Sequence, residues 1–480
     1  MRGCVFLLFA TAAALRPMQA GVALKQARNA LRTRQPPPSP ALLASSSPAA
    51  GATLTGSIVA GTYTGVMQFT FAAACASVIF APVGLPLTIG IQHALIGFVI
   101  MQCVVTKTTS VPGRVVLSVP SFEVLPFLAK FALICSSAIG AGAPASLLAT
   151  VLVGSILVNI LSAGLLALAS LFPVSEISKL LPPPLQAGLF SAIGWSLYLL
   201  SYDTLGLGVA ASTLFTWKAA MLWLPANLLG VGLWKASRES DSPLLFPGFI
   251  LATSVLVHAV RLATGTTVDA SRAAGWLMAE AIGEPCTALF KSISPSLIRW
   301  DVLRSAVAAK QLVLAALFGP LVNTILNFVL YGPMIGEQLD LKHELRSHAA
   351  GSAAGALGGG YANYIGISDN AVHRKIGGLD ARSCYFAAAV GALFLLAYPL
   401  CVVVGYVPTL AIAAICVFIG IDFMYDNLIA NWQENGAKIG LAAFAVLFVC
   451  VKKDMLWGLL LGIAAAQGVG WWQRRQLKAA

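Results

Sequence analysis

The stretch LGGGYANYIGISDNAVHRKIGG, residues 357–378, interrupts a chain that is 58% hydrophobic and only 10% charged. Glycine is a poor helix former, so Gly358 to Gly360 predict the end of one helix. Ser, Asp and Asn favour helix starts, so a short helix is expected to begin at about Ser368. Tyr361 to Gly366, between the two, are expected to be extended. This pattern of a helix, a break and a short helix decides the fold.

The rest of the chain is apolar in repeated runs of about 20 residues, the length that crosses a hydrocarbon layer about 30 Å thick. The mean hydropathy of the 480 residues is +0.84. Apolar runs predict spans near 55–80, 84–105, 118–142, 145–171, 183–201, 213–234, 243–264, 305–331, 342–358, 383–405, 408–425, 438–451 and 455–472. With the short helix of 357–378 added, the sequence predicts an all-α polytopic membrane protein of about fourteen transmembrane elements.

Other function classes are disfavoured by the distribution of charge and cysteine. The net charge is +12, but the basic residues lie in loops and at the termini, which argues against a nucleic-acid partner. Most of the nine cysteines fall inside apolar runs, as small buried hydrophobic residues do. His258 and His373 have no metal-ligand spacing and are expected at the membrane interface. Without a phosphate loop, nucleophile elbow or zinc motif, no enzyme, cofactor or metal site is expected.

The first 52 residues differ from the rest. Residues 4–15 form a short apolar core after Arg2, and a segment rich in Arg, Ser, Pro and Ala without any acid follows. Two interpretations stay open: a two-part presequence for a plastid reached through the secretory pathway, or a signal peptide with a linker. The predicted domains are this presequence, 1–52, and a transmembrane transporter domain, 53–476. The target is a plastid envelope, or a plasma or internal membrane.

Loop charges predict the orientation. The loops after spans 1, 3, 9 and 11 have no Lys or Arg. Basic residues do occur in the loops and the tail expected on the other side: Lys107, Arg114, Lys179, Lys235, Arg238, Lys342, Arg374, Lys375, Arg382, Arg474, Arg475 and Lys478. This bias places both ends of the membrane domain on the cytosolic or stromal side. The mixed-charge segment 265–304 and the pair Lys452 and Lys453 depart from the pattern.

Two segments suggest an internal repeat. LPPPLQAGLFSAIGW (181–195) and YVPTLAIAAICVFIGI (406–421) each place a glycine twelve positions after a proline, Pro182 with Gly194 and Pro408 with Gly420. Transporters built from inverted repeats have Gly- and Pro-interrupted segments at corresponding places in their two halves.

Taken together, these segments resemble the sulfate permease (SulP) anion transporters, the family that includes pendrin and prestin, and particularly its bacterial-type branch. LPPPLQAGLFSAIGWSLYLL looks like the family's fifth span, DSPLLFPGFILA its seventh, LDLKHELRSHAAGSAAGALGGG the run before its tenth, and VPTLAIAAICVFIGIDFMYDNL its twelfth. The matches run in order from about 54 to 473. The family usually adds a cytosolic STAS domain after the last span, whereas this chain ends at Ala480.

The resemblance implies two inverted repeats of seven segments, arranged as a core and a gate domain. It also implies a substrate site between the facing N-termini of two half-helices, the third and tenth elements. Such an N-terminus has unpaired N–H groups and a positive dipole end, which can hold an anion without a formal charge. The expected partners are a small inorganic anion, H⁺ or Na⁺ as the coupling ion, and lipid; a second copy in a homodimer is a further candidate.

In the tenth element, the expected substrate-binding residues are Gly366, Ser368, Asp369 and Asn370. One interpretation is that the last three only cap the helix; the other is that Ser368 and the free amides face the substrate. Asp369 departs from the family, which has a basic or neutral residue at this place. It could be protonated and couple transport to H⁺, assist a cation such as Na⁺, or turn away and cap the helix.

In the third element, SVPGRVVLSVPSFEVLPFLAKF (110–131) resembles the family's SYPGxxxGPQDAP. Pro120 suits a helix start. Ser118 and Ser121 could donate hydroxyl groups to an oxyanion. Glu123 lies in the expected first turn, as a coupling residue, a structural cap or a partner of Lys130.

Other spans contribute two further candidates. In the first span, the family's Pro, Gln and aromatic positions align with Thr70, Phe71 and Cys75, so a side-chain donor is missing and Phe71 is expected as an apolar wall or a core residue. In the eighth span, Asn323 and Asn327 share one helix face, as interhelical hydrogen-bonding residues or as site lining.

The expected function is a secondary active transporter or exchanger of small inorganic anions, sulfate or bicarbonate, that works by alternating access. Two alternatives stay open. One is a proton- or cation-coupled carrier of the same fold for another substrate, such as a nucleobase, which site carboxylates would suit. The other is a non-transporting, structural family member.

Overall fold

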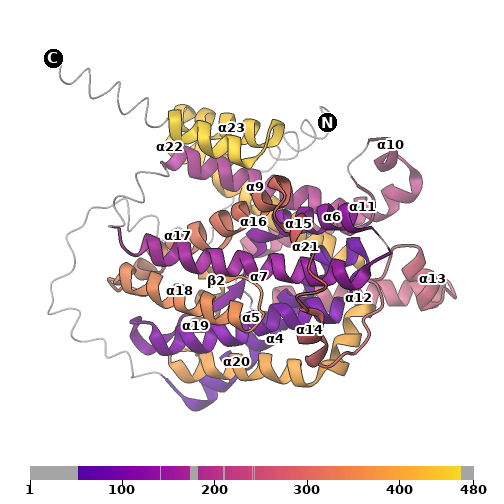
Figure 1. The fold of residues 1–480 in the computed structure, drawn as a ribbon, viewed down its shortest axis with the longest axis horizontal. Coiled ribbons are helices and arrows are strands. Elements are labelled where there is room, and N and C mark those ends of the chain that lie inside the picture. The colour runs from indigo at the N-terminus through magenta and orange to yellow at the C-terminus, as the bar shows by residue number, and fades with distance from the viewer. Residues whose placement is uncertain are drawn as a thin grey trace.

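A computed structural model describes residues 52–140, 142–172, 182–208, 211–240, 242 and 244–465. Apart from residue 52, the predicted presequence lies outside the described residues, as does the chain after 465. The described chain is almost entirely helical and contains one two-stranded sheet. Figure 1 shows β2 (Asn363–Ile365) in the middle of the bundle, surrounded by helices.

The first half of the membrane domain has seven elements, four of which have a short helical turn at one end. They are α4 (Leu54–Ile79) with η1 (Ala81–Val83); α5 (Leu87–Thr108) with η2 (Pro112–Arg114); β1 (Ser118–Pro120) with η3 (Phe122–Val124) and α6 (Leu125–Ile139); α7 (Pro144–Ala169); α9 (Pro183–Thr204); α11 (Trp217–Glu239) after α10 (Ala211–Leu214); and α12 (Leu245–Ala263). A connecting segment follows, with α13 (Val268–Ala273), α14 (Thr287–Ser292) and α15 (Trp300–Leu303).

The second half repeats this order. Its elements are α16 (Ala306–Ala316) with the π-helical η4 (Leu317–Leu321) and α17 (Val322–Ile335); α18 (Leu341–Leu357); β2 with α19 (Ile367–Lys375); α20 (Ala381–Leu396) with η5 (Tyr398–Tyr406); α21 (Thr409–Met424) with η6 (Tyr425–Ala430) and α22 (Asn431–Asn435); α23 (Ala437–Lys452); and a short apolar helix, Met455–Ala465. The described chain therefore has the predicted fourteen elements.

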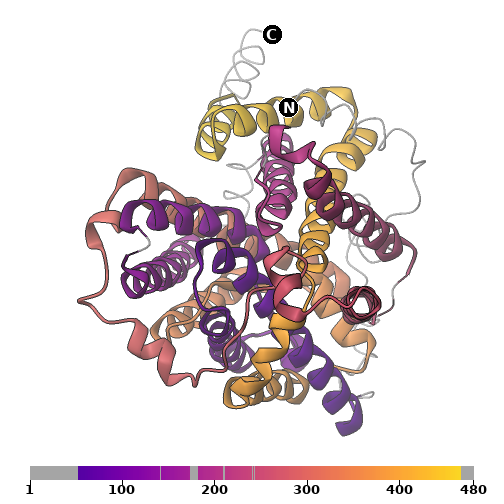
Figure 2. The same ribbon diagram turned by 90° about the vertical axis from the view of Figure 1, so that its right-hand side faces the viewer.

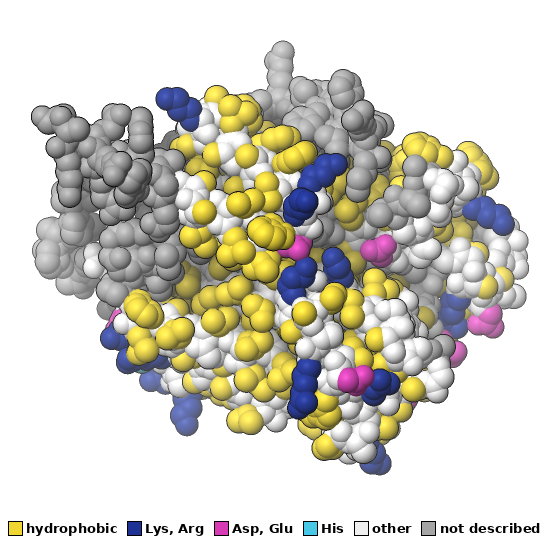
Figure 3. All heavy atoms as spheres, turned by 45° about the horizontal axis from the view of Figure 1, so that its top comes forward, with side chains coloured by type: hydrophobic (Ala, Val, Ile, Leu, Met, Phe, Trp, Pro, Cys, Tyr) yellow, Lys and Arg dark blue, Asp and Glu magenta, His cyan; other side chains and the backbone are white. Residues whose placement is uncertain are grey.

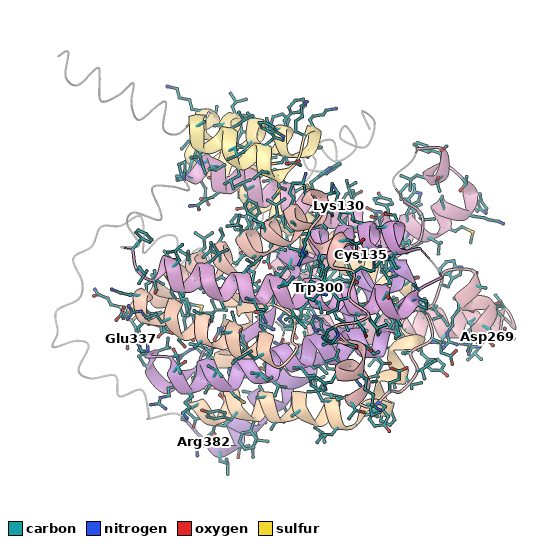
Figure 4. All side chains as sticks on the ribbon, in the orientation of Figure 1. Lys130, Cys135, Asp269, Trp300, Glu337 and Arg382 are labelled. Atoms are coloured by element: carbon teal, nitrogen blue, oxygen red, sulfur yellow. The ribbon has the colours of Figure 1, made fainter. Side chains whose placement is uncertain are left out.

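The protein is a multi-pass membrane protein. Among the described residues, seven helices are long and apolar enough to cross a membrane, or eight if one bent pair counts as a single span. Figure 3 shows hydrophobic side chains spread over a wide area of one face, as expected for a surface that contacts lipid. Figure 4 places Glu337 and Arg382 at one end of the long helices and Asp269 at the other, so loops predicted on opposite sides lie at opposite ends.

One predicted span differs from the prediction. The run 383–405 is not a straight helix, because α20 ends at Leu396 and η5 leaves it at an angle of 84°. Pro399 explains the break, since proline lacks the N–H that would continue the helix and disfavours helical geometry at the residue before it.

The two halves are related by symmetry, as the repeated Pro and Gly predicted. Pro182 and Pro408 are the N-cap residues of α9 and α21, and these two helices pack against each other. A Cβ atom added to Gly194 would lie 2.7 Å from the carbonyl oxygen of Gly420, and one added to Gly420 would lie 2.7 Å from that of Gly194. Such a reciprocal contact is what a two-fold axis between repeats produces.

Other helix pairs follow the same symmetry. Helix α5 packs against α20 as α18 packs against α7, and α9 against α23 as α21 packs against α11. Gly188 meets Val446 in one of these pairs, and Gly230 meets Val417 in its counterpart. Small residues let helix backbones approach closely, which is how helices associate where lipid is as apolar as the side chains. Figure 2 shows α23, at the yellow end of the chain, above the magenta α9.

A buried charge cluster joins α11 to α21 and η6. Arg238 donates to Asp422 at 2.5 Å and to Asp426 at 2.7 Å, and its guanidinium lies over the rings of Trp234 and Tyr425. The Arg238 side chain is 13% exposed, so its charge is mostly removed from solvent. Two carboxylates, one helical turn apart, thus depend on one cation.

We expect Arg238→Met to lower the free energy of unfolding by about 3–5 kcal/mol, because it leaves two partly buried carboxylates uncompensated. Thermal unfolding in detergent measures the effect. The control is Lys235→Met on the same helix, which removes a 3.9 Å pair with Glu239 whose side chains are 60% and 43% exposed; it should change the stability by less than about 0.5 kcal/mol. Equal melting temperatures for the two variants would contradict the conclusion that Arg238 stabilises the fold through Asp422 and Asp426.

Candidate functional site

Two short strands cross in the middle of the bundle. β1 pairs with β2 in an antiparallel register, with Val119 opposite Tyr364. Each strand runs directly into a helix, β1 into η3 and α6, and β2 into α19. Because the strands are antiparallel, the two helices leave in opposite directions and their N-termini face the sheet between them. The half-helix pair predicted for the third and tenth elements is therefore present.

Proline and glycine set where these helices begin. Pro120 ends β1, and Pro126 lies in the first turn of α6. Gly366 is the N-cap residue of α19, with no side-chain cap, and a Cβ atom there would lie 2.7 Å from the carboxylate of Asp369 and 2.8 Å from Val119. The first amides of each helix have no partner within the helix, and each N-terminus carries the positive end of the helix dipole.

The predicted residues of α19 have different roles. Gly366 is the N-cap, so none of Ser368, Asp369 and Asn370 occupies that position. The Asp369 carboxylate accepts a hydrogen bond from its own backbone amide in the first turn, which is the capping role predicted as one alternative for it. Ser368 is exposed. Asn370 is fully buried, accepts a hydrogen bond from the Leu117 amide at 3.0 Å and donates to the Gly366 carbonyl at 2.8 Å. Asn370 therefore fixes α19 to the chain that leads into β1.

Asp369 lies in the first turn of α19 and is partly buried. It is close enough to Tyr63 of α4 and to Glu123 of η3 for electrostatic interaction with both. The structure thus brings the two predicted coupling residues together from opposite half-helices. No ion pair of Asp369 with a Lys or Arg occurs within the described residues.

Glu123 is buried, with 2% of its surface exposed. Its carboxylate accepts hydrogen bonds from the Ser121 hydroxyl at 2.9 Å and from the Tyr364 hydroxyl at 3.0 Å. The predicted alternative that it pairs with Lys130 is wrong, because Lys130 is exposed and forms no ion pair with it. Since Tyr364 belongs to β2, Glu123 ties one half-helix to the strand that starts the other.

Aromatic side chains flank the start of η3. Phe71 of α4 meets Phe122 edge to face, with ring centroids 5.3 Å apart. The Tyr361 hydroxyl donates to the carbonyl oxygen of Ser121 at 2.8 Å. Phe71 therefore lies next to the half-helix N-terminus, where an apolar wall was predicted.

Two other candidates mainly hold the strands. The amide and hydroxyl of Ser118 both point to the side-chain oxygen of Gln102, at 2.8 and 3.3 Å. Asn327 donates to the Ile365 carbonyl at 2.5 Å, and Asn323 donates to carbonyls of the preceding turn. Hydrogen bonds that hold β1 and β2 thus occupy Ser118 and Asn327, whereas Asn323 bonds to the π-helical turn before it.

Gln68 of α4 is a residue near the half-helices that the sequence interpretation missed. It is fully buried, and neither polar atom of its side chain has a hydrogen-bond partner among the described residues. It lies one turn from Thr64, which bonds to His373 of α19, and one turn from Phe71, so it lies on the α4 face that meets both half-helices. A side-chain donor therefore does exist in the first span. A single Gln in an otherwise apolar run was the available signal.

Residues outside the predicted set hold the chain before β2. His93 of α5 bonds to the Gly359 carbonyl at 2.7 Å and to the Ser155 hydroxyl at 2.8 Å. Asn159 of α7 donates to the carbonyls of Gly360 and Tyr361. The expectation that His373 is interfacial is wrong, because it is fully buried between the hydroxyls of Thr64 and Ser383. These contacts satisfy backbone and side chains that no water reaches.

No family model and no curated protein matches the chain by sequence. Solved structures do match its fold. The transmembrane domain of a cyanobacterium bicarbonate transporter, BicA, is similar with a TM-score of 0.58 and 16% identity, over 86% of this chain and 98% of that one. The overall structure of SLC26A9 is similar with a TM-score of 0.60 and 12% identity, over 96% of this chain and 72% of that one.

A third structure is murine Solute Carrier 26 family member A9, an anion transporter, in the inward-facing state. Its TM-score is 0.61 at 11% identity, over 96% of this chain and 76% of that one. At these identities the likeness concerns the fold. The chain therefore has the transmembrane fold of these anion transporters, the fold that the resemblance to the sulfate permease family implies.

Proposed function

We propose that this protein belongs to the sulfate permease family and is a secondary active transporter or exchanger of a small inorganic anion, sulfate or bicarbonate. The observation that carries the proposal is the pair of half-helix N-termini that face each other across β1 and β2. Free amides and positive dipole ends suit an oxyanion. That one neighbour in fold is a bicarbonate transporter supports bicarbonate as the first substrate to test.

Gln68 supplies the side-chain donor of the proposed site. A buried amide without a partner costs about 1–3 kcal/mol, and an oxyanion bound between the half-helices would accept its N–H group. The exposed Ser368 hydroxyl is the second donor, and Phe71 forms the apolar wall.

The two carboxylates indicate coupling to a positive ion. Asp369 and Glu123 lie near each other and near the proposed anion, and neither forms an ion pair within the described part of the chain. When both carboxylates are ionised, their negative charges repel each other and the bound anion. Binding of H⁺ or Na⁺ together with the anion would remove that repulsion. The same carboxylates favour one alternative, a proton-coupled carrier of a neutral substrate such as a nucleobase.

Uptake by the reconstituted full-length protein tests the function. Proteoliposomes are supplied with radiolabelled sulfate, bicarbonate or uracil, with the pH and Na⁺ gradients varied independently. Saturable uptake of an anion supports the proposal. Uptake of uracil alone would favour the nucleobase carrier, and the absence of uptake of all three would favour a structural family member.

We expect Gln68→Leu to raise the KM for the anion about tenfold or more, because one hydrogen bond to a charged group is worth about 1.5–3 kcal/mol. The matched control is Thr70→Val on the same helix, whose hydroxyl already bonds to the Val66 carbonyl at 3.1 Å; it should leave KM within twofold. A larger rise in KM for the Thr70 variant than for the Gln68 variant would show that Gln68 is not the donor.

We expect Asp369→Asn to weaken the dependence of uptake on pH or Na⁺ while anion binding is retained. In a proton-coupled protein, wild-type uptake rises as the pH falls on the side of entry, because protonation removes the negative charge beside the anion. The Asn variant mimics the protonated state and should be nearly independent of pH. Glu123→Gln, which can still accept a hydrogen bond from Tyr364, is compared in parallel. An unchanged coupling ratio in both variants rules out a coupling role.

A further inference from the structure

Three polar side chains between α17 and α18 have atoms without a hydrogen-bond partner. They are the Thr324 hydroxyl, the His348 Nε2 atom and the Ser352 hydroxyl, considering only the described residues. Each of the three residues has 0% of its surface exposed. A buried polar atom left unpaired costs about 1–3 kcal/mol, and no lipid chain can satisfy it.

Other buried hydroxyls of the bundle behave differently. Those of Ser77, Thr150, Ser162 and Ser191 donate to the carbonyl oxygen four residues earlier in their own helix, all at 2.7 Å. This is the usual solution for Ser and Thr in membrane helices. Thr324 and Ser352 do not use it, so their hydroxyls are directed elsewhere.

The packing of α17 on α18 brings the three groups together. The helices follow one another through a short connection, 336–340, and contact each other, so they are antiparallel. The rings of Phe328 and His348 meet edge to face, with centroids 4.8 Å apart. One turn back along α17 is Thr324, and one turn onward along α18 is Ser352. In an antiparallel pair these two positions face each other, one turn from His348.

The hydrogen-bonding role of the His348 ring determines which molecule could bond to all three side chains. Its Nδ1 atom lies 3.3 Å from the carbonyl oxygen of Glu344. A carbonyl oxygen can only accept, so Nδ1 donates, and in the neutral ring Nε2 is then an acceptor. An acceptor and two hydroxyls that do not reach one another can all be satisfied by a molecule that both donates and accepts. Buried water typically makes about three such bonds to otherwise unpaired groups.

We propose that α17 and α18 enclose a buried water-binding site formed by Thr324, His348 and Ser352. This site is separate from the half-helix N-termini and does not depend on the proposed transport function. Asn327, one turn from Thr324 on α17, holds β2 through the Ile365 carbonyl. Helix α18 leads directly into the glycines before β2. The bound water therefore joins the two elements that position this strand.

X-ray radiolytic labelling of the full-length protein in lipid nanodiscs tests the site, because hydroxyl radicals made from bound water oxidise the side chains beside it. Phe328, which is 2% exposed, should be oxidised several times faster than Phe98 and Phe131, which are both 0% exposed and lie elsewhere in the bundle. The double variant Thr324→Val, Ser352→Ala should reduce the rate at Phe328 to that of the controls. Equal rates in the wild type, or a rate unchanged in the variant, would overturn the proposal.

Thermal unfolding distinguishes a bound water from a dry cluster. If water bridges the groups, Thr324→Val and Ser352→Ala should each lower the melting temperature by about 2–4 °C, and the double variant should lower it by less than the sum. If the hydroxyls are dry, removing them should raise the melting temperature instead, which would overturn the proposal. Ser162→Ala, whose hydroxyl is bonded within its own helix, is the matched control and should have little effect.

Discussion

The structure depends on the pairing of β1 with β2. Backbone that leaves the helical conformation inside a membrane must find hydrogen-bond partners in the protein, because lipid supplies none. Here the backbone groups of the two non-helical segments bond to each other. Val119 pairs with Tyr364, and the amide of Ser121 donates to the Ala362 carbonyl at 3.1 Å. At the other end, the Gly366 amide donates to the Leu117 carbonyl at 3.3 Å. Neither half-helix could start in mid-membrane without the other.

This mutual dependence explains the surrounding polar residues. Gln102, Asn327 and Asn370 come from three different helices, yet each bonds to the backbone of a break. His93 and Asn159 do the same for the glycine segment before β2. Polar side chains in membrane helices are costly unless they are satisfied. These five side chains therefore help to hold the two short strands and the glycine segment before β2 in place.

The sequence predicted this architecture where the signal was local. Gly358 to Gly360 end α18 as expected, and the repeated Pro and Gly identify α9 and α21 as counterparts. Individual roles were less predictable, because they depend on partners far away in the chain. Asn370 bonds to a residue 253 positions away, and the His373 ring is buried by a contact 309 positions away. Composition shows that a polar residue lies in a span, but only the fold shows what it bonds to.

Gln68 is another residue whose position relative to the half-helices could not be predicted from the motif alignment. An alignment by motif placed the donor position at Thr70 to Cys75, whereas a helix face is set by turns of 3.6 residues. Thr64, Gln68 and Phe71 are spaced by four and three, so they share the face that meets the half-helices. The alignment put the family's Gln at Phe71, one helical turn from Gln68 and on the same face, so both side chains lie beside the half-helices.

The charges at the centre decide what the proposed site can bind. Each helix N-terminus contributes roughly half a positive charge, so the two together amount to about +1. Asp369 and Glu123 contribute −2 when both are ionised, which leaves the empty site negative. A monovalent anion would then enter against repulsion in a medium of low dielectric constant, where such repulsion is strong. One bound H⁺ or Na⁺ makes the site neutral and a second makes it positive. Under the proposed function, the affinity for an anion therefore depends on how many positive ions bind with it, and a divalent anion such as sulfate requires more of them than bicarbonate does.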